Sequence, residues 1–123
     1  MIEGLGIDIL ANDRLHGIEN KTEFTENVFT RKELRFTRFL TYRDRIYAVY
    51  FSLKEAVLKA LGCGLRFGSF WRDIEIDSRS RVRTTGSIRD LATKKSIKTI
   101  HASSAQTRRY ALSIVLLESE DQS

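Results

Sequence analysis

Glu55 and Lys59 are the residues whose types and spacing first suggest chemistry. They lie in the stretch FSLKEAVLKALGCG, residues 51–64, and a helical winding of about 100° per residue places both on one stripe. Phe51 and Leu58 flank the glutamate, so apolar side chains would partly enclose its carboxylate. A Glu and a Lys four residues apart often form a routine helix pair worth about 0.2–0.5 kcal/mol. Such a weak pair does not explain a partly enclosed carboxylate, because a buried charge without a partner is costly.

A second acid, Asp8, favours a functional interpretation over a routine ion pair. It lies on a predicted strand face that also carries two glycines, Gly4 and Gly6, and glycine in a strand often marks the close approach of a ligand or another backbone. If this strand packs against the helix, the carboxylates of Asp8 and Glu55 converge. Proteins hold Mg²⁺ through one or two carboxylates together with waters and substrate phosphates, and Lys59 would suit such phosphates.

Two elements must position these residues. Strict alternation predicts a strand over residues 2–10, with Leu5, Ile7 and Ile9 on the face opposite the glycines. Apolar residues at i, i+3, i+4 and i+7 predict a helix over 43–61, which Gly62 ends.

The rest of the chain alternates short helices and strands. Thr30 and Glu33 form a capping-box pattern that begins a helix running to about Phe39. Further predicted elements are a strand hairpin near 71–77 and 80–86, a short helix starting at Ser87, and closing strands over 97–104 and 110–118. The last of these is almost entirely apolar, so we place it at the centre of the sheet. We expect an α+β fold over one domain, 1–123, with a largely antiparallel sheet packed with a long central helix.

Composition restricts the classes of protein. A length of 123 residues with 41% hydrophobic and 30% charged residues suits one globular domain. The net charge of +5 favours an acidic or phosphorylated partner, and the single cysteine, Cys63, fits a reducing compartment. The N-terminus lacks the basic region of a signal peptide, and no apolar run approaches the roughly 20 residues that span a bilayer. We therefore expect a cytoplasmic protein without a membrane segment.

Two stretches resemble the signature motifs of a known family. GLGIDIL and FSLKEAVLKALGCG are similar to the motifs of the holo-acyl-carrier-protein synthase type of phosphopantetheinyl transferase. FTENVFTRKEL, DIEI and RRYALSIVLLE follow that family's pattern in the same order, so the resemblance covers nearly the whole chain. It implies a phosphopantetheinyl transferase-like fold and a Mg²⁺-dependent transfer of phosphopantetheine from coenzyme A to a serine of acyl carrier protein, within fatty acid biosynthesis.

The resemblance also implies roles for individual residues. Asp8 and Glu55 would bind Mg²⁺, and Glu55 and Lys59 would be the catalytic residues. Lys59 would lie against the coenzyme phosphates or assist proton transfer, and Lys54 and Gly64 would help to hold coenzyme A. Either Glu55 itself or a water on the metal would activate the serine hydroxyl.

Partners follow from the same resemblance. Members of the family form homotrimers with the site at a subunit interface, and they dock the acidic helix of the carrier protein on basic residues. We expect Arg14 above all to do so here, with Lys21, Arg31 and Arg35 as weaker candidates that could equally be ordinary solvated charges.

The sequence departs from the family pattern where coenzyme A is expected to bind. Tyr50 replaces an arginine before the second motif, and Gln106 replaces the histidine of a closing Ser-x-Ser-His or Ser-x-Thr-His motif. Gln106 can hydrogen-bond to the coenzyme without carrying charge, whereas a tyrosine offers stacking in place of a guanidinium fork. The metal half of the expected site is thus intact, and the coenzyme half is altered.

These departures support an alternative function. A non-catalytic member of the same fold could bind the carrier protein or coenzyme A without transfer, although the presence of Asp8, Glu55 and Lys59 argues against it. A small nucleic-acid binder is a third class. We do not expect nucleic acid as a partner, because the basic residues are not gathered on one recognisable element and no binding motif is present.

Overall fold

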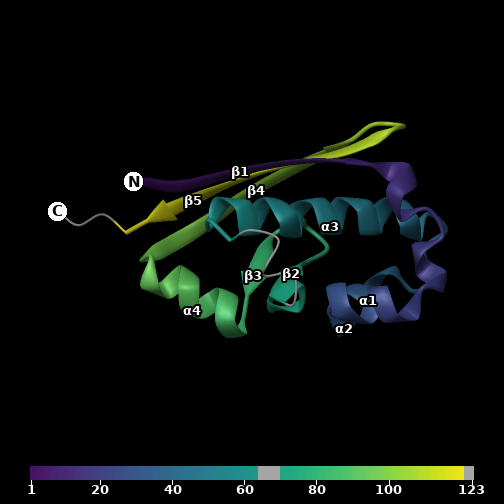
Figure 1. Ribbon diagram of the computed structural model, residues 1–123, viewed down its shortest axis with the longest axis horizontal. Coiled ribbons are helices and arrows are strands. Elements are labelled where there is room, and N and C mark those ends of the chain that lie inside the picture. The colour runs from purple at the N-terminus through teal and green to yellow at the C-terminus, as the bar shows by residue number, and fades with distance from the viewer. Residues whose placement is uncertain (64–69, 121–123) are drawn as a thin grey trace.

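The long helix α3 (Arg43–Ala60) lies along one face of a three-stranded antiparallel sheet (Figure 1). The computed structural model describes residues 1–63 and 70–120. The strands of this sheet, in spatial order, are β1 (Ile2–Ala11), β5 (Tyr110–Ser119) and β4 (Ile97–Gln106). The last strand of the chain is therefore central, as its apolar composition predicts, and the expected α+β fold is confirmed.

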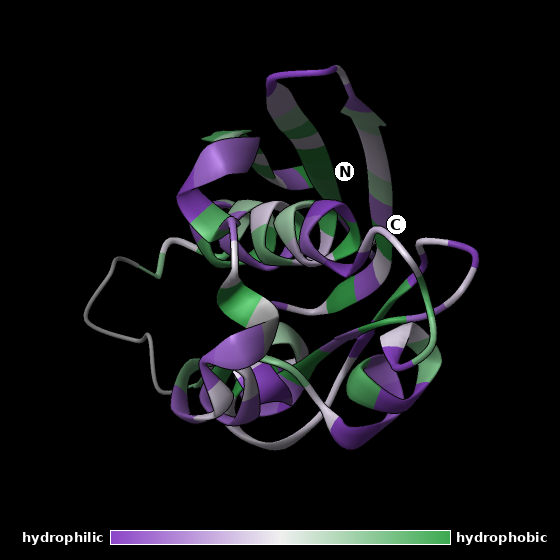
Figure 2. Cartoon of the chain, turned by 90° about the vertical axis from the view of Figure 1, so that its right-hand side faces the viewer, coloured by the Kyte–Doolittle hydropathy of each residue, from purple (hydrophilic) through white to green (hydrophobic). Residues whose placement is uncertain are grey.

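A second layer lies on the other side of α3 (Figures 1 and 2). It contains α1 (Thr22–Val28), α2 (Arg31–Thr37), the antiparallel pair β2 (Ile74–Ile76) and β3 (Val82–Thr84), and α4 (Gly86–Lys94). Two short 3-10 helices, η1 (Asn12–Leu15) and η2 (Ile18–Asn20), connect β1 to α1. With layers on both sides, α3 is buried over most of its circumference, and Leu53, Ala56 and Val57 are completely inaccessible to solvent. None of the helices within the described ranges has the length and apolarity needed to cross a bilayer.

Two glycines allow β1 to lie directly on α3. A Cβ atom on Gly6 would overlap the Ala56 carbonyl oxygen, and one on Gly4 would overlap the Ala60 carbonyl oxygen. Side chains alternate across a strand, so Asp8, two residues beyond Gly6, is also directed to the α3 side. The strand and the helix that carry the predicted site therefore pack together.

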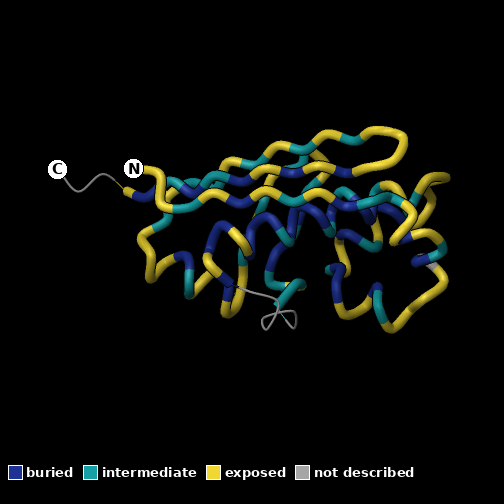
Figure 3. The backbone as a smooth tube through the Cα atoms, turned by 45° about the horizontal axis from the view of Figure 1, so that its top comes forward, coloured by how far each residue is buried: buried dark blue, intermediate teal, exposed yellow. Residues whose placement is uncertain are grey.

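The strands of the large sheet carry many exposed residues (Figure 3), and the face turned away from α3 is apolar. Across this face Ile7 pairs with Ile114, and Ile9 pairs with Leu112. The exposed apolar side chains are Leu5, Ile7, Ile9, Leu112 and Ile114, with 40–65% of each accessible to solvent. An apolar surface of this extent is typical of a face that another protein surface covers.

The predicted start of α2 is confirmed, and the helix ends slightly before the predicted end near Phe39. Thr30 forms the capping box with Glu33, its side chain accepting from the Glu33 N–H while its own N–H donates to Glu33 Oε1 at 2.9 Å. The helix ends at Thr37, whose hydroxyl donates to the Glu33 carbonyl at 3.0 Å, and Phe39 is 86% exposed beyond it.

The predicted hairpin strands and the start of the last helix also differ from the structure. Regular pairing covers only β2 and β3, so the predicted ranges 71–77 and 80–86 were too long. The last helix begins at Gly86 instead of Ser87, because Asp73 supplies the cap from the preceding segment by accepting the Ser87 N–H at 3.0 Å. Local sequence pattern does not reveal such a distant cap.

Candidate active site

Asp8 and Lys59 meet where β1 crosses α3. Lys59 Nζ lies 2.9 Å from Asp8 Oδ1 and donates a second hydrogen bond to the Ile7 carbonyl at 3.1 Å. The Asp8 side chain is only 12% exposed, whereas that of Lys59 is 51% exposed. The ion pair therefore lies at the edge of the strand–helix contact, with the ammonium open to solvent. The routine pairing of Lys59 with Glu55 is wrong, since Lys59 pairs with Asp8.

Glu55 finds its partner on a different segment. The indole N–H of Trp71 donates to Glu55 Oε1 at 2.8 Å, and both side chains are half-buried. The Trp71 ring packs on Phe51 with ring centres 5.6 Å apart, so Phe51 supports the residue that holds the carboxylate. From sequence, Trp71 is better explained as a core residue than as a functional one, because nothing local links residue 71 to residue 55.

The two carboxylates fit a magnesium ion better than a metal that needs several protein ligands. Among residues 1–63 and 70–120, no group of three or more His, Cys, Asp or Glu side chains could hold a metal ion. If Asp8 and Glu55 share an ion, Mg²⁺ suits them, because it relies on waters and substrate phosphates for its remaining ligands. The buried Ser113 hydroxyl, directly across the strand pair from Asp8, has no hydrogen-bond partner among the described residues. A buried hydroxyl without a protein partner is typically hydrogen-bonded to an ordered water.

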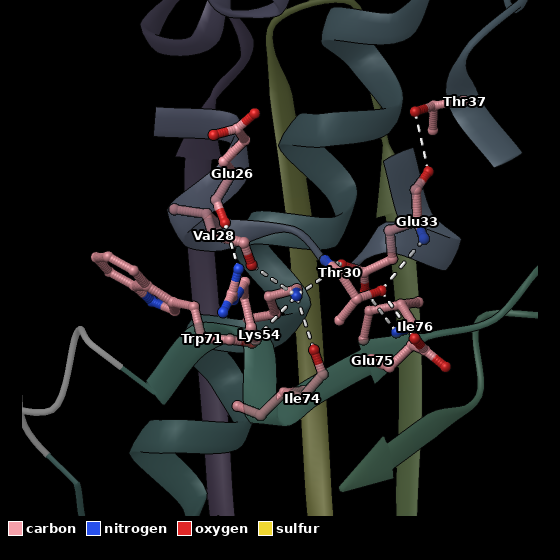
Figure 4. Close-up of polar contacts among 11 residues, drawn as sticks. Glu26, Val28, Thr30, Glu33, Thr37, Lys54, Trp71, Ile74, Glu75 and Ile76 are labelled. Carbon is pink, nitrogen blue, oxygen red and sulfur yellow. Dashed lines mark hydrogen bonds and ion pairs between the residues drawn. The ribbon is translucent and has the colours of Figure 1, made fainter. Parts of the chain in front are cut away.

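Lys54, expected to help hold coenzyme A, is buried, and its ammonium is engaged within the chain. Its ammonium pairs with Glu33 Oε1 at 2.7 Å, and neither side chain has any solvent exposure. It also donates to the carbonyls of Val28, Trp71 and Ile74 at 2.9, 3.1 and 2.7 Å (Figure 4). All the donors of an ammonium are thereby used, and none is left for a ligand.

The pair formed by Lys54 and Glu33 is fully enclosed. Burial raises the pKa of the Glu33 carboxyl and lowers the pKa of the Lys54 ammonium, and the attraction between them opposes both shifts. Glu33 also accepts the Ile76 N–H at 2.7 Å. The pair therefore joins α2, α3 and β2, and it anchors the residue that immediately precedes Glu55.

Comparison with known proteins identifies the family. Residues 4–115 match the family model of the 4'-phosphopantetheinyl transferase superfamily. The chain belongs to this superfamily. It is 36% identical over 123 residues to the holo-[acyl-carrier-protein] synthase of Clostridium novyi (strain NT), covering 96% of this chain and 88% of that protein. It is 37% identical over 117 residues to the synthase of Caldanaerobacter subterraneus subsp. tengcongensis, covering 91% of each.

Solved structures agree over almost the full length. The holo-ACP-synthase of Plasmodium yoelii superposes with a TM-score of 0.81 at 25% identity and covers 98% of each chain. The synthase of Bacillus anthracis str. Ames, in complex with CoA (3',5'-ADP), gives a TM-score of 0.78 at 28% identity and covers 98% of this chain and 99% of that one. The resemblance to phosphopantetheinyl transferases of the holo-acyl-carrier-protein synthase type, inferred from the motifs, is confirmed.

Within this transferase, the two departing residues are engaged internally. Tyr50 is only 4% exposed, so it has little surface on which a ligand could stack. Burial, with smaller contributions from the carboxylates of Glu33 and Asp77, raises the pKa of Tyr50 to about 12. The Gln106 amide donates to Asn12 Oδ1 at 3.1 Å and to the Arg45 carbonyl at 2.9 Å. It thus ties the end of β4 to the start of α3.

The remaining predicted residues are not brought together with Asp8 and Glu55. Arg14 is exposed on η1, and Lys21 is exposed just before α1. Arg31 and Arg35 are exposed on α2. Gly64, predicted to contact the coenzyme, lies outside the described residues.

Proposed function

We propose that this chain transfers the phosphopantetheine group of coenzyme A to a serine hydroxyl of an acyl carrier protein, with Mg²⁺. The observation that carries the proposal is the convergence of Asp8 and Lys59 beside the stripe of α3 that holds Glu55. Support comes from the relatives named holo-[acyl-carrier-protein] synthase and from relatives whose structures contain coenzyme A.

The reaction is a displacement at phosphorus. The serine oxygen forms a bond to the β-phosphorus of coenzyme A, the bond from that phosphorus to the bridging oxygen breaks, and 3',5'-ADP leaves. A bound Mg²⁺ would be held by Asp8 and Glu55 and would neutralise charge on the pyrophosphate.

The side chains of the chain supply positioning and proton transfer. The half-exposed Lys59 ammonium is free to rotate from Asp8 towards a phosphate oxygen, where it would stabilise negative charge. Glu55, held at one oxygen by Trp71, keeps its other oxygen for the serine proton or for the metal. Catalysis of this kind depends chiefly on positioning and charge neutralisation.

A second candidate function is binding without transfer. Tyr50 is buried and Gln106 hydrogen-bonds within the chain, so the coenzyme half of the site differs from the family pattern. Such a protein would bind the carrier protein or coenzyme A and release both unchanged.

Mass spectrometry of intact carrier protein separates the two functions. Purified apo acyl carrier protein is incubated with this protein, coenzyme A and Mg²⁺, beside Glu55→Gln and Lys59→Met variants. We expect the carrier mass to rise by one phosphopantetheine with the wild type, and we expect both variants to lose most of that activity. An unchanged carrier mass, with wild type verified as folded and several carriers tested, would favour the binding function.

We further propose a homotrimer in which the exposed face of the large sheet is covered. Its apolar side chains on β1 and β5 are 40–65% exposed in one chain, and covering them would stabilise the assembly by about 25 cal/mol per Å². The molar mass of the protein, measured by light scattering after size-exclusion chromatography, tests this assembly. Ile114→Glu, at the centre of the face, is expected to yield monomers, and a monomeric wild type would contradict the assembly.

A further inference from the structure

Four arginines gather at the end of the molecule formed by α1, α2 and the start of α3. Arg31, Arg35 and Arg38 follow one another at i, i+4 and i+7, which places them on one face of α2 and its C-cap. Arg43, the first residue of α3, approaches from the other side. The four line an open hollow of about 640 Å³, which we call the arginine hollow.

The positive charge of the arginine hollow is not neutralised within the chain. Among the described residues, none of the four guanidinium groups forms an ion pair, and Glu26 is the one carboxylate that lines the hollow. The contacts of Arg38 and Arg43 leave their charges available. Arg38 lies 5.1 Å from the centre of the Phe39 ring, and Arg43 Nη1 donates to the Arg38 carbonyl at 3.5 Å.

The chemistry of the hollow selects multiply charged anions. Like charges held around a concave surface raise the local potential and attract counter-ions, and a guanidinium presents paired donors that match phosphate oxygens. Leu34 and the buried Tyr47 form apolar parts of the wall, which strengthens electrostatic attraction by excluding water. No residue of the hollow belongs to the set formed by Asp8, Glu55 and Lys59.

We propose that the arginine hollow binds a small ligand with two or more adjacent phosphate groups, separately from the transfer reaction. A concave site that lies between three elements fits such a ligand better than it fits a flat protein surface. The diphosphate could belong to a nucleotide or to a free polyphosphate, which share this chemistry.

Calorimetry with simple probes tests the proposal. Inorganic phosphate, pyrophosphate, tripolyphosphate and ADP are titrated into the protein with EDTA present, in a Lys59→Met background that disables the other phosphate site. Affinity should rise with the number of phosphates, and Arg35→Ala/Arg38→Ala should weaken pyrophosphate binding at least about tenfold, since both substitutions remove charged hydrogen-bond donors. Tighter binding of ADP than of pyrophosphate would identify a nucleotide as the ligand, and equal binding would identify a polyphosphate.

A matched double variant controls for net charge. Arg79→Ala/Arg89→Ala removes two exposed arginines outside the hollow and should bind pyrophosphate like its parent. Equal loss in both double variants would show general charge attraction and would overturn the proposal. Binding of a poly-glutamate peptide, without binding of pyrophosphate, would overturn it in favour of a protein partner.

A separate observation concerns Trp71, and it rests on the proposed function. We infer that Trp71 is a positioning residue that orients Glu55 for the metal. Its indole N–H holds Glu55 Oε1 at 2.8 Å, its ring packs on Phe51, and its carbonyl accepts from the buried Lys54 at 3.1 Å (Figure 4). The Trp71 ring is therefore held by Phe51, and its backbone is held by Lys54. Groups that hold a metal ligand in this way typically affect metal affinity by 10–100-fold.

The single tryptophan of the chain allows a direct test without substrates. One indole N–H signal is expected in a nitrogen–proton NMR spectrum, and Mg²⁺ should shift it in the wild type but not in Glu55→Gln. Trp71→Phe keeps a ring against Phe51 but removes the donor, and its affinity for Mn²⁺, measured by electron paramagnetic resonance, should fall roughly tenfold. An indole signal insensitive to Mg²⁺, or a Trp71→Phe variant with wild-type Mn²⁺ affinity, would overturn the inference. Failure of transfer alone would refute the proposed function and leave this role standing.

Discussion

Replacing Lys54 by methionine should destabilise the protein strongly. The change leaves the Glu33 carboxylate in a site with no solvent exposure, retaining as donors only the N–H groups of Ile76 and Thr30. Removing one partner of a buried pair typically costs about 3–5 kcal/mol, a large part of the roughly 5–15 kcal/mol that stabilises a domain. With a urea dependence of about 1–3 kcal/mol per M, the unfolding midpoint should fall by at least about 1 M.

The pH dependence of Lys54→Met gives a second signature. Burial raises the pKa of Glu33, and loss of the ammonium removes the main opposing influence. The folded variant then binds a proton more tightly than the unfolded chain. Its stability is therefore fully present below the ordinary glutamate pKa of about 4.3 and is lost as the pH rises through the raised value. We expect Lys54→Met to be more stable at pH 5 than at pH 8.

Two controls make the reasoning refutable. Lys59→Met removes a lysine whose side chain is 51% exposed, so its cost should stay below about 1 kcal/mol. Lys54→Met/Glu33→Gln removes both charges and should recover much of the lost stability. A Lys54→Met protein within about 1 kcal/mol of wild type, with a raised KM for coenzyme A, would refute the structural role and restore Lys54 to the coenzyme site.

Three further predictions concern β1, Tyr50 and Gln106. Gly6→Ala should lower stability by about 1–3 kcal/mol, seen as a lower thermal midpoint, because its Cβ would overlap the Ala56 carbonyl; an unchanged midpoint would mean that β1 can move away from α3. Since the pKa of Tyr50 is raised to about 12, its phenolate absorbance should appear well above pH 10. The folded state should lose stability as the pH rises from about 10 to about 12. Tyr50→Phe should lack this loss of stability. Gln106→Ala should cost about 1 kcal/mol of stability per hydrogen bond lost and leave the KM for coenzyme A unchanged; a large rise in KM with normal stability would show that Gln106 binds the coenzyme.

The fold was largely predictable because its determinants are periodic. Alternation identified the first strand, the i, i+3, i+4 pattern identified α3, and the apolar last strand was placed correctly at the centre of the sheet. Element ends were predicted less well. The helix α2 ends at Thr37, short of the predicted end, and Asp73 caps α4 from outside it.

The contacts of the predicted site residues could be anticipated only in part. Asp8 was expected to approach the stripe of α3 that holds Glu55, and it forms an ion pair with Lys59 of that stripe. The pairing of Glu55 with Trp71 joins α3 to the segment before β2, and the burial of Lys54 depends on acceptors from separate elements. A residue's exposure depends on which other segments pack over it, so a lysine in a signature motif reads the same in sequence whether it is buried or free.

The buried ammonium of Lys54 has a consequence for how α3 can move. Its acceptors come from the end of α1, from α2 and from both ends of the segment 71–74, so turning the helix about its own axis would break all of these bonds at once. Glu55 is the next residue and lies about 100° further around the helix axis. The direction in which Glu55 leaves the helix is therefore fixed by the contacts of Lys54. Rotation of α3 about its own axis is therefore restricted. Adjustment to different substrates must come from side-chain rotation, above all that of the half-exposed Lys59.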